Sequence, residues 1–322
     1  MKVRNEKLKL LVNGTIAAVV TGVFAFWAMS LSDLEDVATG LTSSPVSGWV
    51  ACSAMMAAVT LCRYMRIQFC VPAAPVLSLY RASALHGAAI SVLPGKIGEA
   101  VLPLALRQLA NIPFLGGAGL LLLIRAFDMA ALITLAMIAY GLAGVAEPDL
   151  QRLVVIVMPI TILLLMATPI IVIYGLRFLP KGDHFFGRMI SSVTAALAIM
   201  PLWRLYLVLC NTILLWVFLA AATFFSISAV GLEPTPVNAM LAVALASFAF
   251  ALPINGIASI GPFEAAFAFG LGLFGMPLDP SIAAAAHLHI CAVGVALIAA
   301  LFGQLAVMVV SLRAESVMEV TK

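Results

Sequence analysis

Long apolar runs alternate with short polar segments along the whole chain. Six of these runs approach or exceed the roughly 20 residues that a helix needs to cross a bilayer. We expect about six full spans, at residues 9–30, 47–69, 114–141, 153–176, 202–228 and 281–311. Two further apolar stretches, 76–110 and 236–274, are interrupted near their middles. The pattern predicts an all-α polytopic membrane protein that forms a single domain over residues 1–322.

Proline and glycine interrupt both of these stretches. The first break contains Pro94 and Gly95, and the second contains Pro253 and Gly256. Backbone groups freed at such breaks cannot face lipid, so they must be buried in protein or line a watery cavity. An arm of about 12 residues covers roughly 18 Å, a little over half of the hydrocarbon thickness. This length favours two re-entrant helix hairpins, although breaks into short full spans also fit the pattern.

Composition excludes a soluble domain. Hydrophobic residues make up 64% of the chain and charged residues only 10%, and the mean hydropathy is +1.17. The sequence has no phosphate-binding loop, dinucleotide fingerprint or zinc signature, so we expect no cofactor, no metal and no nucleic-acid partner. The cysteines lie mostly within apolar runs without metal-ligand spacing, and we expect small buried hydrophobic residues at Cys52, Cys62, Cys70, Cys210 and Cys291.

Basic residues are concentrated in alternate loops, as the positive-inside rule requires. With both termini in the cytoplasm, 15 of the 17 lysines and arginines fall on the cytoplasmic side, Arg63 and Arg66 among them. In this orientation the first broken stretch enters from the cytoplasm and the second from the opposite side. The two stretches would then be inverted copies, and the segments 47–141 and 202–311 are candidates for an inverted-topology repeat.

Two glutamates beside the breaks are the main candidates for chemistry. Glu99 follows the first break, and Glu264 follows the second. An ionised carboxylate near the bilayer centre costs about 2.5–3.5 kcal/mol on insertion scales, so it usually serves a function. Glu264 comes two residues after Pro262, in what we expect to be a first helical turn, so capping of its own helix is the alternative.

Basic residues surround the first break. Lys96 lies inside it, with Arg81 before it and Arg107 after it. Exposed backbone amides together with cations favour an anion such as phosphate. The alternative for Arg81 and Arg107 is that their long side chains extend to the cytoplasmic head groups.

Further polar residues lie within the expected spans. Arg125 and Asp128 are three residues apart on one helix face, where they can neutralise each other or share a substrate phosphate. Together with the residues around the first break they leave a surplus of two positive charges, which a phosphate-bearing head group would offset. His289, near the start of the last span, either faces the cavity near Glu264 or packs as a core residue.

Three blocks, Leu93–Glu99, Arg125–Asp128 and Gly261–Ala265, stand in an order and spacing that carry a family resemblance. The chain resembles the lysylphosphatidylglycerol synthase transmembrane family, a group of flippase-like integral membrane proteins. The resemblance covers most of the chain. It implies a stand-alone member that lacks the aminoacyl-transferase domain of other members, and therefore lipid translocation rather than an enzymatic activity.

The chain departs from the family pattern at three places. Leu102 stands where an arginine is frequent, and Ile124 stands where an acidic residue is common. His289 lies near the position of an expected arginine. These departures suggest a divergent branch that acts on a specialised lipid.

The leading hypothesis is a flippase or scramblase of a bacterial-type inner membrane that moves a phosphate-bearing lipid. A phospholipid, a polyprenyl-phosphate-linked glycolipid or a related specialised lipid fits this description. A secondary transporter of a small anion is the first alternative, since it would use the same broken helices. A non-catalytic membrane subunit of a glycolipid pathway, partnered with a lipid-modifying enzyme, is the second. A homo-oligomer is compatible with each hypothesis.

Overall fold

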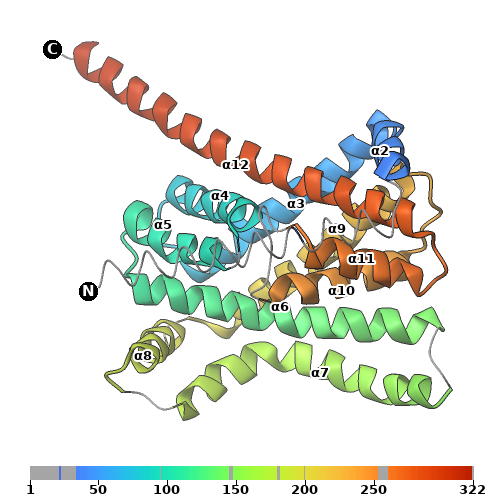
Figure 1. Cartoon of the computed structure of the whole chain (residues 1–322). Helices are drawn as coiled ribbons and strands as arrows, with labels where there is room; N and C mark the ends of the chain where they lie inside the picture. Colours follow the sequence, from blue (N-terminus) through green and yellow to red (C-terminus); the bar gives the residue numbers. More distant parts are fainter. Residues whose placement is uncertain are drawn as a thin grey trace.

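The computed structural model describes residues 22, 34–94, 96–144, 148–179, 182–198, 200–252 and 260–320, and within them the regular elements are all helices (Figure 1). In chain order they are α2 (Leu34–Thr42), α3 (Val46–Cys70), α4 (Val76–Val92), the 3₁₀ helix η1 (Ile97–Ala100), α5 (Val101–Ala110), α6 (Phe114–Ala143), α7 (Pro148–Phe178), α8 (Phe185–Ala198), α9 (Leu202–Ala229), α10 (Pro236–Ala251), α11 (Pro262–Gly272) and α12 (Leu278–Val320). The expected all-α class is confirmed.

Within the described part of the chain, five helices are long and apolar enough to cross a membrane. They cover Val46–Cys70, Phe114–Ala143, Arg152–Gly175, Leu202–Ala229 and Leu278–Val309. Five of the six predicted spans are therefore confirmed to within a few residues at most ends. The remaining predicted span, residues 9–30, lies almost wholly outside the described residues.

Both broken stretches consist of two helices in contact with each other. In the first, α4 ends at Val92, and the chain passes through η1 into α5, which packs against α4. In the second, α10 and α11 pack together, and the break around Pro253 and Gly256 lies outside the described residues. The proposed re-entrant course of these helix pairs, and their inverted-repeat relationship, stay predictions.

Gly98 allows the first break to fold tightly against α4. A Cβ atom at this position would lie 2.6 Å from the carbonyl oxygen of Ala89 and 2.7 Å from the Cα of Ile90. Backbone atoms cannot move aside as a flexible side chain can, so only glycine fits here without a shift of the helix. This close approach brings the next residue, Glu99, over the face of α4.

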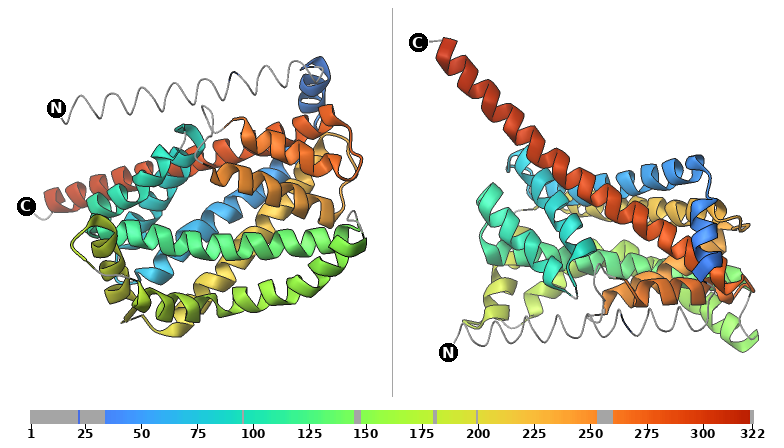
Figure 2. Two further views of the ribbon diagram at one scale, coloured as in Figure 1. Left: turned by 60° about the horizontal axis from the view of Figure 1, so that its bottom comes forward. Right: turned by 45° about the horizontal axis from the view of Figure 1, so that its top comes forward.

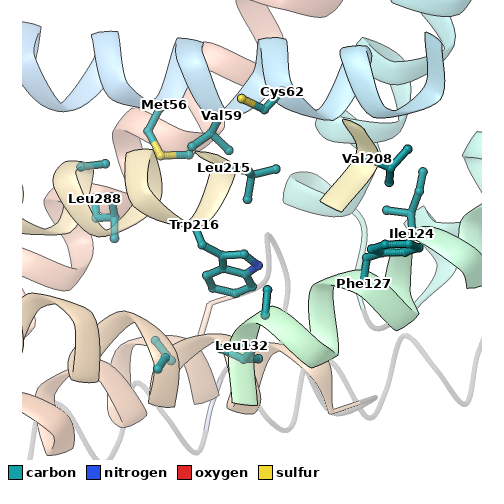
Figure 3. Packing of buried hydrophobic residues seen from close by; sticks show 14 of the residues in the cluster. Met56, Val59, Cys62, Ile124, Phe127, Leu132, Val208, Leu215, Trp216 and Leu288 are labelled. Carbon is teal, nitrogen blue, oxygen red and sulfur yellow. The ribbon is translucent and has the colours of Figure 1, made fainter. Parts of the chain in front are cut away.

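The centre of the bundle is formed by α3 and α9, which pack along one another. Figure 3 shows Met56 and Val59 of α3 close to Leu215 and Trp216 of α9, all of them buried. Between membrane helices such close packing, rather than release of water, supplies most of the attraction. The two broken stretches pack against this pair of helices, α4 against α3 and α10 against α9.

Outer helices present large apolar side chains. Ile156 and Leu163 on α7 are 66% and 69% exposed, and Ile298 and Phe302 on α12 are similarly open. In water a surface of this kind would mark an interaction site, whereas lipid tails cover it without penalty. The two helices lie at the edges of the bundle, and α12 crosses it obliquely and extends beyond it (Figures 1 and 2).

Candidate functional site

A cavity of about 460 Å³ lies among α3, α4, η1, α6, α9 and α10. Its wall carries four cations, two carboxylates and one histidine: Arg63, Arg66, Lys96, Arg125, Glu99, Asp128 and His86. The remaining wall is mainly apolar, and Leu132, Leu215, Trp216 and Leu219 belong to it. The site therefore combines a dense charged group with a hydrophobic surface.

A continuous chain of ion pairs and hydrogen bonds joins four elements across this cavity. Arg66 of α3 bonds to Oδ1 of Asp128 on α6, and Nη1 of Arg125 donates to its Oδ2 at 3.3 Å. Nη2 of Arg125 donates to Oε1 of Glu99 in η1 at 2.5 Å. His86 Nε2 on α4 lies 3.2 Å from the other oxygen of Glu99. Each carboxylate thus bridges two basic side chains, which offsets its burial.

Lys96 connects the two broken stretches. Its Nζ donates to the carbonyl oxygen of Phe250 at 2.7 Å and lies 5.0 Å from the centre of the same residue's ring. Phe250 is in the last turn of α10, where carbonyl groups lack an intrahelical partner and the helix dipole favours a cation. This contact joins the first break to the C-terminal end of α10, the first helix of the second broken stretch.

Two of the four cations remain without a carboxylate. Among the residues that the structure describes, Arg63 and Lys96 form no salt bridge, whereas Arg66 and Arg125 share Asp128 and Glu99. Nε of Arg66 and Nε1 of Trp216 are also buried without a hydrogen-bond partner, although both residues line the cavity. The site thus has a surplus of two positive charges, with His86 neutral, and unused N–H donors.

The structure places the predicted basic residues in two groups. Lys96 and Arg125 line the cavity, as expected. Arg81 does not; its Nη2 donates to Oε1 of Gln304 on α12 at 2.6 Å. Arg107 lies exposed in the last turn of α5, also outside the lining. The four cations of the cavity also exceed its two carboxylates by two, but the residue set differs from the predicted one, because Arg63 and Arg66 line the cavity and Arg81 and Arg107 do not.

Sequence reasoning did not select Arg63 and Arg66 as site residues, because it assigned them to the cytoplasmic end of their span by the positive-inside rule. A signal was nonetheless present. The two arginines are three residues apart inside an apolar span, and so share one helix face, as Arg125 and Asp128 do. Arg66 is 4% exposed, which is unusual for a side chain that reaches head groups.

Glu264 and His289 form a second polar site outside the lining of this cavity. Oε1 of Glu264 lies 2.6 Å from Nδ1 of His289, and its Oε2 accepts the backbone N–H of Gly261 at 2.7 Å. Glu264 therefore caps its own helix and pairs with α12 at the same time. The ring of Phe263 lies between this pair and Phe250, 6.2 Å from the His289 ring and 6.4 Å from the Phe250 ring.

We expect Glu264→Ala to lower the melting temperature more than Glu264→Gln does. Loss of a helix N-terminal cap typically costs about 0.5–2 kcal/mol, and glutamine retains an oxygen that can accept the Gly261 N–H. Thermal unfolding of the purified protein in detergent measures the difference, and Glu233→Ala, at an exposed glutamate, is the control. Equal melting temperatures for the alanine variant and the wild type would contradict a stabilising role for this cap.

The fold and the charged cavity define an integral membrane protein with several membrane-crossing helices and an ionised site enclosed among them. The chain belongs to the family described as the lysylphosphatidylglycerol synthase TM region, whose profile matches residues 14–300. This match includes α2 to α11 and about half of α12. No curated protein matches the chain significantly.

Proposed function

We propose that this protein translocates a phosphate-bearing lipid across a bacterial-type inner membrane, with both termini in the cytoplasm. The observation that carries the proposal is the surplus of two positive charges in the cavity, contributed by Arg63 and Lys96. Uncompensated charge in a low-dielectric site is unfavourable, and a phosphate or phosphodiester would offset it. Membership of a family of membrane domains with flippase-like members supports the same conclusion.

The form of the cavity favours a lipid over a small ion. Its volume of about 460 Å³ lies within the range of about 300–1,000 Å³ usual for small-molecule sites, and exceeds what a lone phosphate needs. Leu122 and Met129 on α6 line it and are also 51% and 37% exposed, so the cavity reaches the surface at an apolar rim. A head group bound at the charged wall would leave its tails at this rim.

No catalytic residue is required for this role, so we propose a transporter and not an enzyme. Guanidinium groups and ammonium groups bind phosphate oxygens through charge-assisted hydrogen bonds. Arg125 and Arg66, already held by carboxylates, would present their remaining N–H groups in a fixed orientation. Arg63 and Lys96 would supply the charge that distinguishes an anionic head group from a neutral one.

Lys96→Met and Arg63→Met are the tests of head-group recognition. We expect each to slow translocation of an anionic phospholipid by about tenfold or more, since hydrogen bonds to charged groups contribute about 1.5–3 kcal/mol. Zwitterionic and uncharged lipids should be affected much less. Chemical quenching of fluorescent lipids in proteoliposomes measures the rates, and Arg107→Met, at an exposed arginine outside the cavity, is the matched control.

Equal losses for all three lipid classes would contradict the head-group assignment, because they would indicate a structural role for both cations. Uptake of inorganic phosphate or chloride by proteoliposomes that do not translocate lipid would favour the small-anion transporter instead. A protein that moves neither, yet binds a lipid-modifying enzyme tightly, would favour the membrane subunit.

A further inference from the structure

Two cysteines and a histidine meet away from the charged cavity. Cys52 belongs to α3, and His287 and Cys291 lie four residues apart on one face of α12. One potential ligand atom from each lies within 4.8 Å of the others, and all three residues are buried, with exposures of 0%, 0% and 4%. None of the three lines the cavity. We name this group the Cys–His cluster.

Hydrogen bonds determine which nitrogen of His287 carries its proton. The single hydroxyl proton of Ser226 is donated to the carbonyl oxygen of Ala284, at 2.6 Å. The Ser226 oxygen can therefore only accept from Nδ1 of His287, which lies 3.2 Å away. The proton of a neutral imidazole is then on Nδ1, and Nε2 keeps a lone pair. This Nε2 is buried without a hydrogen-bond partner.

A neutral histidine nitrogen with a free lone pair, next to two thiols, is the form in which these side chains bind metals. Metal-bound histidines usually donate their second ring N–H to a fixed acceptor, which sets the tautomer and the ring orientation. Ser226 on α9 provides that acceptor here. The ring of Trp49, whose centroid is 3.9 Å from that of His287, holds the imidazole from another side. The orientation of His287 is thus set by α3 and α9 together.

We propose that Cys52, His287 and Cys291 bind one Zn²⁺ ion. Two cysteines and one histidine are a known zinc ligand set with an open fourth position. Binding would release both thiol protons, and the two thiolates would balance the charge of Zn²⁺, so that a neutral complex is buried. Cu⁺ with the same ligands would leave one negative charge in a low-dielectric interior.

The separation of the ligand atoms fits this ion after a small contraction. With Zn–S bonds of about 2.3 Å, two thiolates on one tetrahedral ion are about 3.8 Å apart. The two sulfur atoms and a ring nitrogen of His287 lie within 4.8 Å of one another, so the sulfur atoms need to approach by at most about 1 Å. Bound zinc would join α3 to α12, beside the contact that α12 makes with α9 through Ser226.

Metal analysis of the full chain tests the site. Protein purified under reducing conditions and dialysed against a zinc-buffered solution should retain about one zinc ion per chain. Cys52→Ser and Cys291→Ser should lose this zinc, whereas Cys62→Ser, a buried cysteine of α3 outside the cluster, should keep it. Ser226→Ala, which removes the acceptor for Nδ1, should weaken zinc affinity by about 10–100-fold while leaving the ligands intact.

Cobalt substitution provides a readout that does not depend on activity. Co²⁺ in the wild-type chain should show thiolate-to-metal charge-transfer absorption, and this absorption should vanish in Cys291→Ser. A wild-type protein that binds neither Zn²⁺ nor Co²⁺ stoichiometrically would overturn the proposal. A disulfide between Cys52 and Cys291 in protein isolated from membranes with thiols blocked, or binding of Cu⁺ but not Zn²⁺, would overturn it as well.

Discussion

Asp128→Asn should destabilise the protein by about 3–5 kcal/mol, the usual effect of removing one partner from a buried ion pair. The carboxylate of Asp128 bonds to both Arg66 and Arg125, and the Arg66 side chain is only 5% exposed. Asparagine would leave Arg66 charged, buried and without a carboxylate. Thermal and denaturant unfolding of the detergent-solubilised protein would measure the loss.

The double variant Arg66→Met/Asp128→Leu separates charge from packing. Replacing both partners of a buried pair with apolar residues is often neutral or stabilising, so this variant should unfold nearer to the wild type than Asp128→Asn does. Asp149→Asn is the matched control, since Asp149 and Arg152 form an exposed pair at the same three-residue spacing. We expect little or no effect there. If Asp128→Asn behaves like this control, the buried ion pair does not stabilise the fold.

Glu99→Gln should reduce the rate of lipid translocation by about tenfold or more without lowering the apparent affinity for anionic lipid. The substitution removes a negative charge from the cavity and so increases its surplus to three. An anionic head group would then be held more strongly and released more slowly. Arg125 would keep Asp128 as its only carboxylate, and His86 would face a neutral amide.

The relation between rate and lipid concentration in proteoliposomes distinguishes this effect from those of Lys96→Met and Arg63→Met, for which we expect the affinity for anionic lipid to fall. Glutamine preserves the shape and part of the hydrogen bonding of Glu99. Melting temperature is measured in parallel, to check that the lower rate is not caused by a loss of stability. A Glu99→Gln variant with wild-type rates would show that the carboxylate has no part in transport.

Membrane spans were predictable because their length and apolarity are local properties of the sequence. The breaks in the two remaining stretches were predictable for the same reason, since proline and glycine act on their own backbone. The packing partners of these helices were not. The close contact between α3 and α9 joins residues far apart in the chain, and apolar periodicity on a helix buried on several sides does not specify its neighbours.

Four of the seven charged or titratable residues of the site followed from the sequence. Glu99 and Lys96 stand out beside a break, and Arg125 and Asp128 form a local pair, so each has a signal within a few residues. Arg66 reaches Asp128 from 62 positions away, and no local pattern specifies that contact. The Cys–His cluster was missed for a similar reason. Its residues come from α3 and α12, which are far apart in the sequence, so they do not form a short metal-binding motif.

The pairing of His289 with Glu264 bears on the departure from the family pattern near the last span. An arginine was expected near this position, and in this chain a histidine contacts the carboxylate at 2.6 Å. Histidine carries its charge only when protonated, whereas arginine is always charged. In this chain the contact between α11 and α12 is therefore made by a histidine instead of an arginine.

The Lys96 ammonium contacts both the carbonyl oxygen and the ring of Phe250 and keeps two further N–H donors. Under the proposed function a lipid phosphate would attract this ammonium, so phosphate binding would weaken the contact between α10 and the first break. A ligand shifts a conformational equilibrium only by its difference in affinity between the two states. Here that difference arises at the Lys96 nitrogen atom. The bound lipid would itself weaken the contact between α10 and the first break. Neutral lipids would attract Lys96 less and would leave its contact with Phe250 in place.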